Sequence, residues 1–322
     1  MKNNFTFEPL KMVRRGIIVD TDIGADCDDV GALAVLHCLA NQYDIPILGI
    51  INCTSNVYGC GAIDVVNRYY GKKDIAIGMY EGKGFLDDPE TLIYNKFLSE
   101  TYKTDFYPVG EKRAEPATRL YRKLLAQAPE KGIVLVTIGP LNNVANLLKS
   151  QGDDISPKDG STLVQEKVHA VVSMAGSATT TRQEFNICSD GDAAEVFIKR
   201  LPVPVIYCDF DLGYSVCSGF NGKEPANALC NPVFQSYRLH SAVLNSSSYQ
   251  NQSYDLIAMH FAFEGVGDFY RMSRSGWMNI DRTAGNITEF EYDSGGLQSY
   301  IELNCSAEVL AKCFDELLQK QI

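Results

Sequence analysis

Five carboxylates fall within ten residues near the start of the chain. They are Asp20, Asp22, Asp26, Asp28 and Asp29, and the run from Gly16 to Asp29 that carries them contains no Lys, Arg or His. Like charges this close repel one another, and partial burial strengthens the repulsion. A cation among them would relieve it, and all-oxygen ligands favour a hard ion such as Ca²⁺ or Mg²⁺. The run therefore predicts a metal or catalytic site.

The acidic run lies between two elements that would hold it in place. Residues 17–20 before it predict a buried strand, and residues 28–40 at its end predict an apolar helix. Similar pairs recur along the chain. Further strands are expected at 47–51, 75–78, 133–138, 168–174 and 205–207, and further helices at 61–70, 117–128, 141–149 and 193–199. This alternation predicts an α/β fold with a mostly parallel open sheet and helices on both faces.

The sequence offers no obvious place to divide the chain. It contains no internal repeat and no low-complexity linker, so residues 1–322 are expected to form a single Rossmann-like domain. Two segments, at about 80–116 and 213–254, are irregular, and the second includes a helix near 232–244. Long irregular insertions often form lids or binding loops. We therefore expect both segments to lie at the active site.

Polar residues follow several predicted strands at the point where each strand ends. In open parallel sheets, ligands bind beyond the carboxyl ends of the strands. The residues gathered by this rule are Asp20, Asp22, Asn52, Asn56, Ile138 to Pro140, Gly176 to Asn186, Asp209 and Asp211. Such carboxylates, amides and exposed carbonyls predict a site for a cation and a polyhydroxy ligand.

An ordered set of motifs resembles the inosine/uridine-type nucleoside hydrolases, which cleave the N-glycosidic bond of ribonucleosides. The motifs are Asp20-Thr21-Asp22-Ile23-Gly24, Asp28-Asp29, Gly49 to Asn56, Ile138 to Asn143, Met174-Ala175-Gly176, Glu184-Phe185-Asn186 and Tyr254-Asp255. They occur in the family's order and span most of the chain. The long acidic run, together with the lack of a histidine before Asp255, looks like one branch of this family.

The resemblance implies a site that uses Ca²⁺ as its cofactor. The metal ligands would be Asp22, Asp29, Asp255 and the backbone carbonyl of Ile138, with Asp20 supporting the site from its edge. The groups that bind the ribose hydroxyls would be Asp28, Asn56, Glu184 and Asn186. Asp22 would deprotonate a metal-held water, which attacks the anomeric carbon as the base departs. The reaction would resemble inverting glycoside hydrolysis.

Two departures from the family pattern concern the base. Three residues, Ala25, Asp26 and Cys27, separate the glycine from the Asp pair, where the commonest spacing has one. Asp26 is expected to be a solvated residue at a helix start. Tyr254 stands where the best-known members carry a histidine that protonates the leaving base. His240 or Tyr254 could contact the base instead, and the preference for purine or pyrimidine stays open.

Composition excludes some partners. A net charge of −11 argues against nucleic acid or an anionic membrane, which would call for a basic patch. The ten cysteines are scattered without a Cys-x-x-Cys pair, as expected in a reducing compartment. The first fifteen residues lack the apolar stretch of a signal peptide, so a cytoplasmic protein is expected. The resemblance implies a homodimer or homotetramer with a nucleoside or another riboside as its small-molecule partner.

Two other functions stay open at this stage. An apolar strand ending in Asp-x-Asp is also typical of aspartate-based phosphatases, with Asp20 as nucleophile and Asp22 as acid and base. That reading lacks a convincing lysine and a later acidic pair, and leaves Glu184 to Asn186 unexplained. Alternatively, the chain could bind ribose and Ca²⁺, or hydrolyse another riboside, with weak activity on nucleosides.

Overall fold

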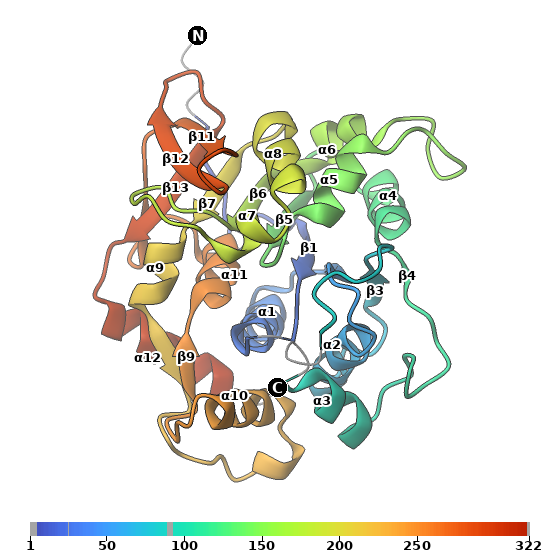
Figure 1. The fold of residues 1–322 in the computed structure, drawn as a ribbon, viewed down its shortest axis with the longest axis vertical. Coiled ribbons are helices and arrows are strands. Elements are labelled where there is room, and N and C mark those ends of the chain that lie inside the picture. Colours follow the sequence, from blue (N-terminus) through green and yellow to red (C-terminus); the bar gives the residue numbers. More distant parts are fainter. Residues whose placement is uncertain (1–4, 25, 89–92, 321–322) are drawn as a thin grey trace.

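An eleven-stranded sheet runs through the centre of the molecule (Figure 1). The computed structural model describes residues 5–24, 26–88 and 93–320. Across the sheet the order is β12-β11-β13-β7-β6-β5-β1-β2-β3-β4, and β10 pairs with β13. The strands are β1 (Gly16–Thr21), β2 (Ile47–Asn52), β3 (Ala76–Met79), β4 (Glu115–Pro116), β5 (Ile133–Thr137), β6 (Val168–Met174), β7 (Val205–Cys208), β10 (Tyr270–Met272), β11 (Gly276–Asp281), β12 (Ile287–Tyr292) and β13 (Gln298–Leu303).

Neighbouring strands from β4 across to β13 are parallel, whereas β10, β11 and β12 pair antiparallel. The helices are α1 (Asp28–Tyr43), α2 (Gly59–Tyr69), α3 (Asn95–Thr101), α4 (Ala117–Gln127), α5 (Asn142–Lys149), α6 (Gly160–Lys167), α7 (Phe185–Ser189), α8 (Gly191–Arg200), α9 (Phe210–Ser215), α10 (Pro232–Val243), α11 (Tyr254–Glu264) and α12 (Ala307–Gln319). The predicted α/β class with a mostly parallel sheet is confirmed.

The two faces of the sheet carry separate apolar cores. Side chains alternate along β1, so Ile17 and Val19 join one core and Ile18 joins the other. Helices α1, α2, α11 and α12 cover the first face, and α4, α5, α6 and α8 cover the second. Apart from its last turn, α1 is buried on every side and packs against the equally buried α11. The prediction of helices on both faces is therefore also confirmed.

The C-terminal part of the sheet differs from the prediction. Each predicted strand and helix is present, and its ends shift by at most three residues. However, four more strands of this sheet, β10 to β13, follow β7, the last predicted strand, and α12 comes after them. In β11 and β12 buried and exposed residues alternate, as in an antiparallel ribbon with one face open to solvent.

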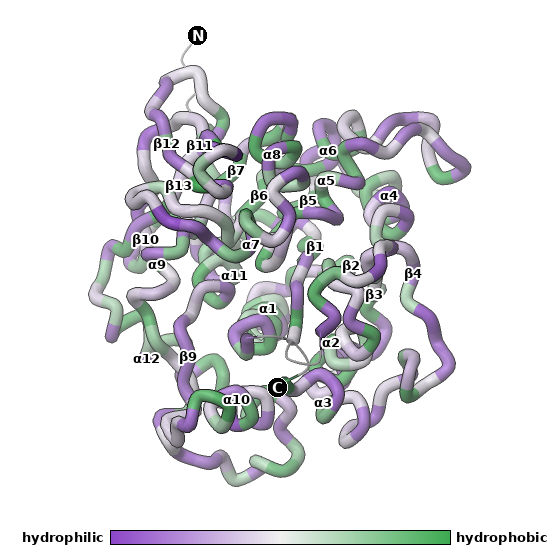
Figure 2. Tube along the Cα trace, in the orientation of Figure 1, coloured by the Kyte–Doolittle hydropathy of each residue, from purple (hydrophilic) through white to green (hydrophobic). Residues whose placement is uncertain are grey.

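The two irregular segments contain short elements of their own. Residues 80–116 include α3 and β4, and residues 213–254 include β8 (Cys217–Gly219), β9 (Gln250–Gln252) and α10. β8 and β9 form a separate antiparallel pair. All three residues of β9 are hydrophilic, and this strand is purple in Figure 2. In the described part of the chain, no helix has the length and apolar character needed to span a membrane.

Candidate active site

A cavity of about 340 Å³ opens at the carboxyl edge of the parallel strands. The loops after β1, β5, β6 and β7 contribute to it, together with the start of α11. Its lining residues are Asp22, Asp26, Asp28, Asp29, Ile138, Met174, Glu184, Phe185, Asn186, Phe210, Tyr254 and Asp255. Six of these carry a carboxyl group, and none is Lys, Arg or His. Most of the predicted site residues therefore meet at one edge, as the strand-end rule requires.

The buried acidic groups come from elements that are distant in sequence. Asp28 and Asp29 occupy the first turn of α1, where the helix dipole favours negative charge. Asp255 begins α11, and its backbone N–H donates to Asp28 Oδ2 over 3.1 Å. Carboxylate oxygens of Asp28, Asp29 and Asp255 all lie within 4.8 Å of one another. This spacing allows all three to contact one ion.

Asp22 and Ile138 sit beside this group because β1 and β5 end together. The backbone N–H of Ile138 donates to the carbonyl of Asp20 over 2.8 Å. A Cβ on the next residue, Gly139, would meet Asp22 Oδ1 at 2.8 Å. Glycine at this turn therefore lets the β5 loop approach the acidic run. The predicted ligands Asp22, Asp29, Ile138 and Asp255 all line the cavity.

The electrostatics of the acidic groups are those of a site that lacks positive charge. Burial raises the pKa of Asp22 to about 7, and repulsion from Asp26 and Glu184 adds to the shift. Burial and mutual repulsion also raise the pKa values of Asp29 and Asp255 well above their ordinary range. A bound hard cation would stabilise the charged forms of these groups. The donor set therefore fits a metal ion.

Asp20 is held behind the cavity. Its Oδ2 accepts hydrogen bonds from the Tyr121 hydroxyl at 2.8 Å and from Asn143 Nδ2 at 3.1 Å. Burial raises its pKa to about 7 even though these bonds act in the opposite direction. Asp20 does not line the cavity. This placement matches a supporting position at the end of β1.

Glu184 organises the loop that follows β6. Its carboxylate accepts from the backbone N–H groups of Gly176, Asn186 and Ile187 at 2.8 to 3.0 Å. Burial raises its pKa to about 7, and these N–H groups act against that shift. Asn186 donates its side-chain amide to the Met174 carbonyl over 3.1 Å. Both Glu184 and Asn186 are thereby fixed against the cavity.

Asn56 has a different position. It is buried, its Oδ1 accepts from the Tyr58 N–H at 2.9 Å, and its Nδ2 has no partner. It is not among the residues that line the cavity. Leaving a buried amide donor unpaired is energetically unfavourable, so the Nδ2 of Asn56 is available to donate a hydrogen bond. Asp209 and Asp211 also lie outside the lining, and Asp209 accepts from Leu212 N–H as the cap of α9.

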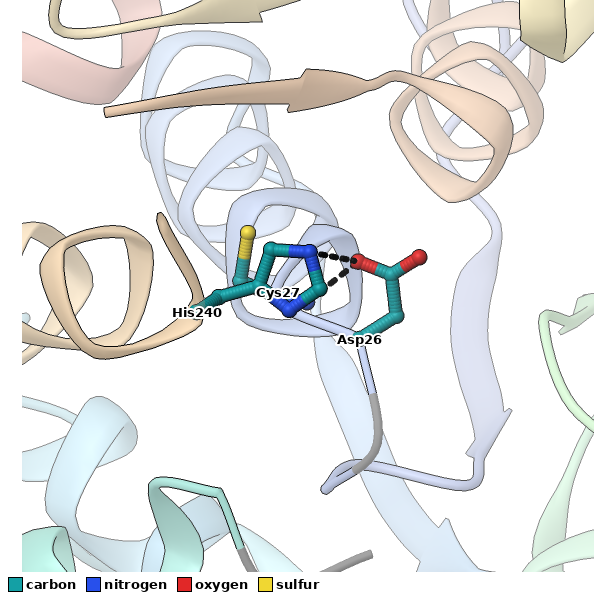
Figure 3. Close-up of side chains that lie close together, drawn as sticks. All are labelled: Asp26, Cys27 and His240. Atoms are coloured by element: carbon teal, nitrogen blue, oxygen red, sulfur yellow. Dashed lines mark hydrogen bonds and ion pairs between the residues drawn. The ribbon is translucent and has the colours of Figure 1, made fainter. Parts of the chain in front are cut away.

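His240 approaches the cavity only through Asp26. Figure 3 shows Asp26, Cys27 and His240 together, with His240 Nε2 3.7 Å from Asp26 Oδ1. The same oxygen accepts from the Cys27 N–H at 2.6 Å and from the amide of Asn251 on β9. The Asp26 side chain is 40% exposed. Asp26 thus lies two residues before the start of α1, and His240 on α10 and Asn251 on β9 also contact it.

Aromatic rings form the other wall of the cavity, and sequence reasoning missed most of them. The rings of Phe210 and Tyr254 are tilted by 37° with centroids 5.3 Å apart, and Phe185 is 51% exposed. A Cβ on Gly213 would meet the Tyr254 ring at 2.3 Å. Glycine is therefore needed for this packing. The available signal was an aromatic residue shortly after a predicted strand end, as at Phe210, three residues beyond residue 207.

A sequence model described as inosine-uridine preferring nucleoside hydrolase matches residues 17–288 of the chain. The chain belongs to the inosine-uridine preferring nucleoside hydrolase family. The matched range includes every predicted site residue, from Asp20 to Asp255. It ends within β12, so β13 and α12 lie beyond it. Membership in this family gives no support to the phosphatase alternative.

Known members of the nucleoside hydrolase family resemble the chain over different lengths. A pyrimidine-specific ribonucleoside hydrolase, RihA from Shewanella sp. (strain MR-4), is 30% identical over 39% of this chain and 37% of its own length. The non-specific RihC from Escherichia fergusonii is 35% identical over 34% and 33%. The matches thus span about a third of these relatives. The solved structure of an inosine-guanosine nucleoside hydrolase shares the fold, with a TM-score of 0.69 at 18% identity over 95% of this chain and 99% of that one.

Proposed function

We propose that this chain catalyses Ca²⁺-dependent hydrolysis of the N-glycosidic bond of ribonucleosides, releasing free base and ribose. One observation carries the proposal. Six carboxyl groups surround the cavity without a basic side chain in the lining, in a member of the nucleoside hydrolase family. Its relatives include pyrimidine-specific and non-specific ribonucleoside hydrolases. Such a cavity suits a cation and a sugar that develops positive charge.

The metal ligands in this proposal are Asp22, Asp29, Asp255 and the carbonyl of Ile138. Hard oxygen donors in this number suit Ca²⁺ with ligand and water oxygens completing its shell. Asp28 already accepts a hydrogen bond from the Asp255 N–H, and we assign its remaining oxygen to a ribose hydroxyl. When bound, Ca²⁺ would supply the positive charge that lowers the pKa of the attacking water.

The chain's own residues then act as follows. Asp22 accepts the proton of the attacking water as general base. Asp28, Glu184 and Asn186 bind ribose hydroxyls from the cavity lining, and Asn56, which lies outside the lining, would supply one further donor through its unpaired Nδ2. Negative charge around the sugar stabilises the oxocarbenium character of the transition state. Asp20, held by Tyr121, keeps the end of β1 in register with these groups.

Two residues are candidates for the acid that protonates the leaving base. Tyr254 lines the cavity at the position before Asp255, and His240 reaches the cavity only through Asp26. Both remain candidates for contact with the base. The long acidic run and Tyr254 are the features that would place the chain in a branch of the family without the usual histidine.

The proposal extends to the organisation of the protein. We propose that residues 1–322 form one domain, because a single sheet joins β1 to β13. Segments 80–116 and 213–254 would flank the active site; α10 and β9 of the second segment already contact Asp26. We also propose a homodimer or homotetramer in the cytoplasm; the net charge of −11 argues against nucleic-acid or anionic-membrane partners.

The test is release of reducing sugar from a panel of purine and pyrimidine nucleosides. Ribose released in equal amount to free base would support the proposal and identify the base preference. A second candidate is a binder of ribose and Ca²⁺, or a hydrolase of another riboside, which Tyr254 at the acid position favours. Binding of ribose without release of sugar from any riboside would favour the binder and contradict hydrolysis.

A further inference from the structure

A cysteine, a histidine and an aspartate meet where α10 approaches the start of α1. Asp26 and Cys27 directly precede α1, and His240 lies on α10 (Figure 3). One ligand atom of each residue lies within 4.8 Å of the other two. Zn²⁺ bonds of about 2.0 to 2.3 Å place the ligand atoms of a tetrahedral site roughly 3.3 to 3.8 Å apart. The 3.7 Å distance between His240 Nε2 and Asp26 Oδ1 falls in that range.

The imidazole of His240 is buried without a hydrogen bond. The residue is 8% exposed, its Nδ1 has no partner, and Nε2 comes no closer than 3.7 Å to an acceptor in the described part of the chain. Burying such nitrogen atoms unpaired is unfavourable, and in native proteins they often mark a bound water or ion. Figure 3 shows the ring directed at Asp26, with the fully buried Cys27 sulfur beside it. The unpaired ring therefore points into the group of ligand atoms.

The donor set differs from that of the Ca²⁺ site. It offers sulfur, nitrogen and oxygen, whereas the Ca²⁺ ligands are all oxygen. Thiolate and imidazole ligands favour Zn²⁺ over hard cations such as Ca²⁺. The two sites can therefore select different ions even though both lie at the acidic run.

The surroundings of Asp26 also suit a ligand. Its Oδ1 accepts from the Cys27 N–H at 2.6 Å and from the amide of Asn251. Carboxylates that bind metals are commonly held by hydrogen bonds of this kind. Asp26 is also one of the six carboxyl groups that line the cavity, and one Ca²⁺ would offset only two of their charges. A second divalent cation is therefore favoured electrostatically.

We propose that Asp26, Cys27 and His240 bind one Zn²⁺ ion, separate from the Ca²⁺ site, and that this ion joins α10 to the start of α1. The thiol proton passes to solvent, and the sulfur coordinates as thiolate. Three protein ligands leave the fourth position to water. The inference goes beyond the proposed hydrolase function and does not depend on it. Ligation would occupy His240 and leave Tyr254 as the candidate for contact with the base.

The first experiment titrates reduced, Ca²⁺-saturated protein with Zn²⁺ in a calorimeter and measures both metals afterwards. We expect one Zn²⁺ per chain, bound without release of Ca²⁺. Zn²⁺ that enters only by displacing Ca²⁺ would place it among the carboxylates and overturn the proposal. No binding of Zn²⁺ would also overturn it and leave water as the partner of His240.

Variants test which side chains hold the ion. Cys27→Ser and His240→Gln each remove a ligand, so Zn²⁺ affinity should fall by more than about a hundredfold, whereas Asn251→Ala, which removes a donor to Asp26, should cost about tenfold. The matched control is Cys313→Ser, because the Cys313 sulfur also lies beside an imidazole, 3.8 Å from His260 Nε2. Circular dichroism checks that each variant is folded. Wild-type affinity in folded Cys27→Ser and His240→Gln would exclude the assigned ligands.

Co²⁺ in place of Zn²⁺ gives a readout of sulfur ligation that does not depend on affinity. A thiolate bound to Co²⁺ produces a charge-transfer absorption band in the near ultraviolet. The band should appear in the wild type and in Cys313→Ser and be absent from Cys27→Ser. A band that persists in folded Cys27→Ser would contradict ligation by this cysteine.

Hydrogen exchange tests whether the ion joins α10 to α1. At a free Zn²⁺ concentration of roughly 100 times Kd, openings that release His240 should become about a hundredfold rarer. Amide exchange that requires such openings in α10 should slow accordingly in the wild type and stay unchanged in His240→Gln. Unchanged exchange in Zn²⁺-loaded wild type would contradict the joining role.

Discussion

The two walls of the cavity differ in how they are held. Asp28, Asp29 and Asp255 on the acidic wall are buried at helix starts, and the Asp255 N–H and the Thr21 hydroxyl donate to oxygens of Asp28 and Asp29. Phe185 and Tyr254 on the aromatic wall are partly exposed and are held by packing, with room supplied by Gly213. The acidic wall is therefore suited to hold the reacting groups in a fixed geometry. The aromatic wall is suited to select the leaving group.

The largest effect is expected from the acidic wall at Asp22. Asp22→Asn removes the proposed proton acceptor while keeping an oxygen near the metal, so kcat should fall about 10³-fold. Steady-state ribose release measures it. The control is Asp44→Asn, because Asp44 is 84% exposed and its left-handed backbone suits asparagine. Comparable activity in both variants would remove Asp22 from the mechanism.

In the absence of metal, the pH dependence of the free energy of unfolding tests how the buried carboxyl groups of the acidic wall affect stability. Burial raises the pKa values of Asp20 and Glu184 to about 7, from ordinary values of 3.8 and 4.5. Between these limits the folded state holds more protons than the unfolded state, so the free energy of unfolding should fall as pH rises from about 4 to 7. Urea unfolding in a calcium chelator measures this slope.

Two controls accompany the pH series. Asp20→Asn removes one titrating group and should make the slope shallower, and added Ca²⁺ should reverse the loss near neutral pH because it favours the charged carboxylates. A stability that rises with pH in the chelator-treated wild type would contradict the burial argument.

A smaller effect is expected behind the acidic wall. Tyr121→Phe removes the hydroxyl that donates to Asp20, so the free energy of unfolding should fall by about 2 kcal/mol. Tyr207→Phe is the matched control, because the Tyr207 hydroxyl is buried without a partner and its loss should be neutral or stabilising. Equal destabilisation by both variants would show that the hydrogen bond to Asp20 contributes little.

The smallest effect concerns the aromatic wall. Gly213→Ala places a Cβ against the Tyr254 ring and backbone, so the ring must shift. KM for the best substrate should rise about fivefold, on the order of 1 kcal/mol, as for loss of one aromatic contact. Gly267→Ala, where nothing lies within 4 Å of the added Cβ, should leave KM unchanged. A wild-type KM in Gly213→Ala would mean that Tyr254 does not contact the substrate.

The acidic wall could be predicted from sequence because its signals are local. Asp20 and Asp22 lie at the end of a strand, Asp28 and Asp29 begin a helix, and the strand-end rule brings the loops together. The same rule placed Glu184 and Asn186 in the lining. In each case, a residue's position relative to a regular element determined where its side chain would lie.

The aromatic wall could not be predicted in the same way. Its geometry depends on how α9 packs against α11, and periodicity within either helix carries no information about that contact. The partners of Asp26 are likewise distant, since Asn251 lies more than 200 residues away on β9. The antiparallel strands were missed although β11 and β12 alternate between buried and exposed positions, because in β11 the apolar Trp277 is exposed between the buried Gly276 and Met278.

Calcium titration of chelator-treated protein, with binding heat and ribose release measured on the same samples, tests the central claim most directly. We expect about one Ca²⁺ per chain, in line with a single group of ligands, and recovery of ribose release in proportion to the bound fraction. Full ribose release in the chelator, or Ca²⁺ binding that leaves the rate unchanged, would contradict a metal-dependent hydrolase at the acidic wall.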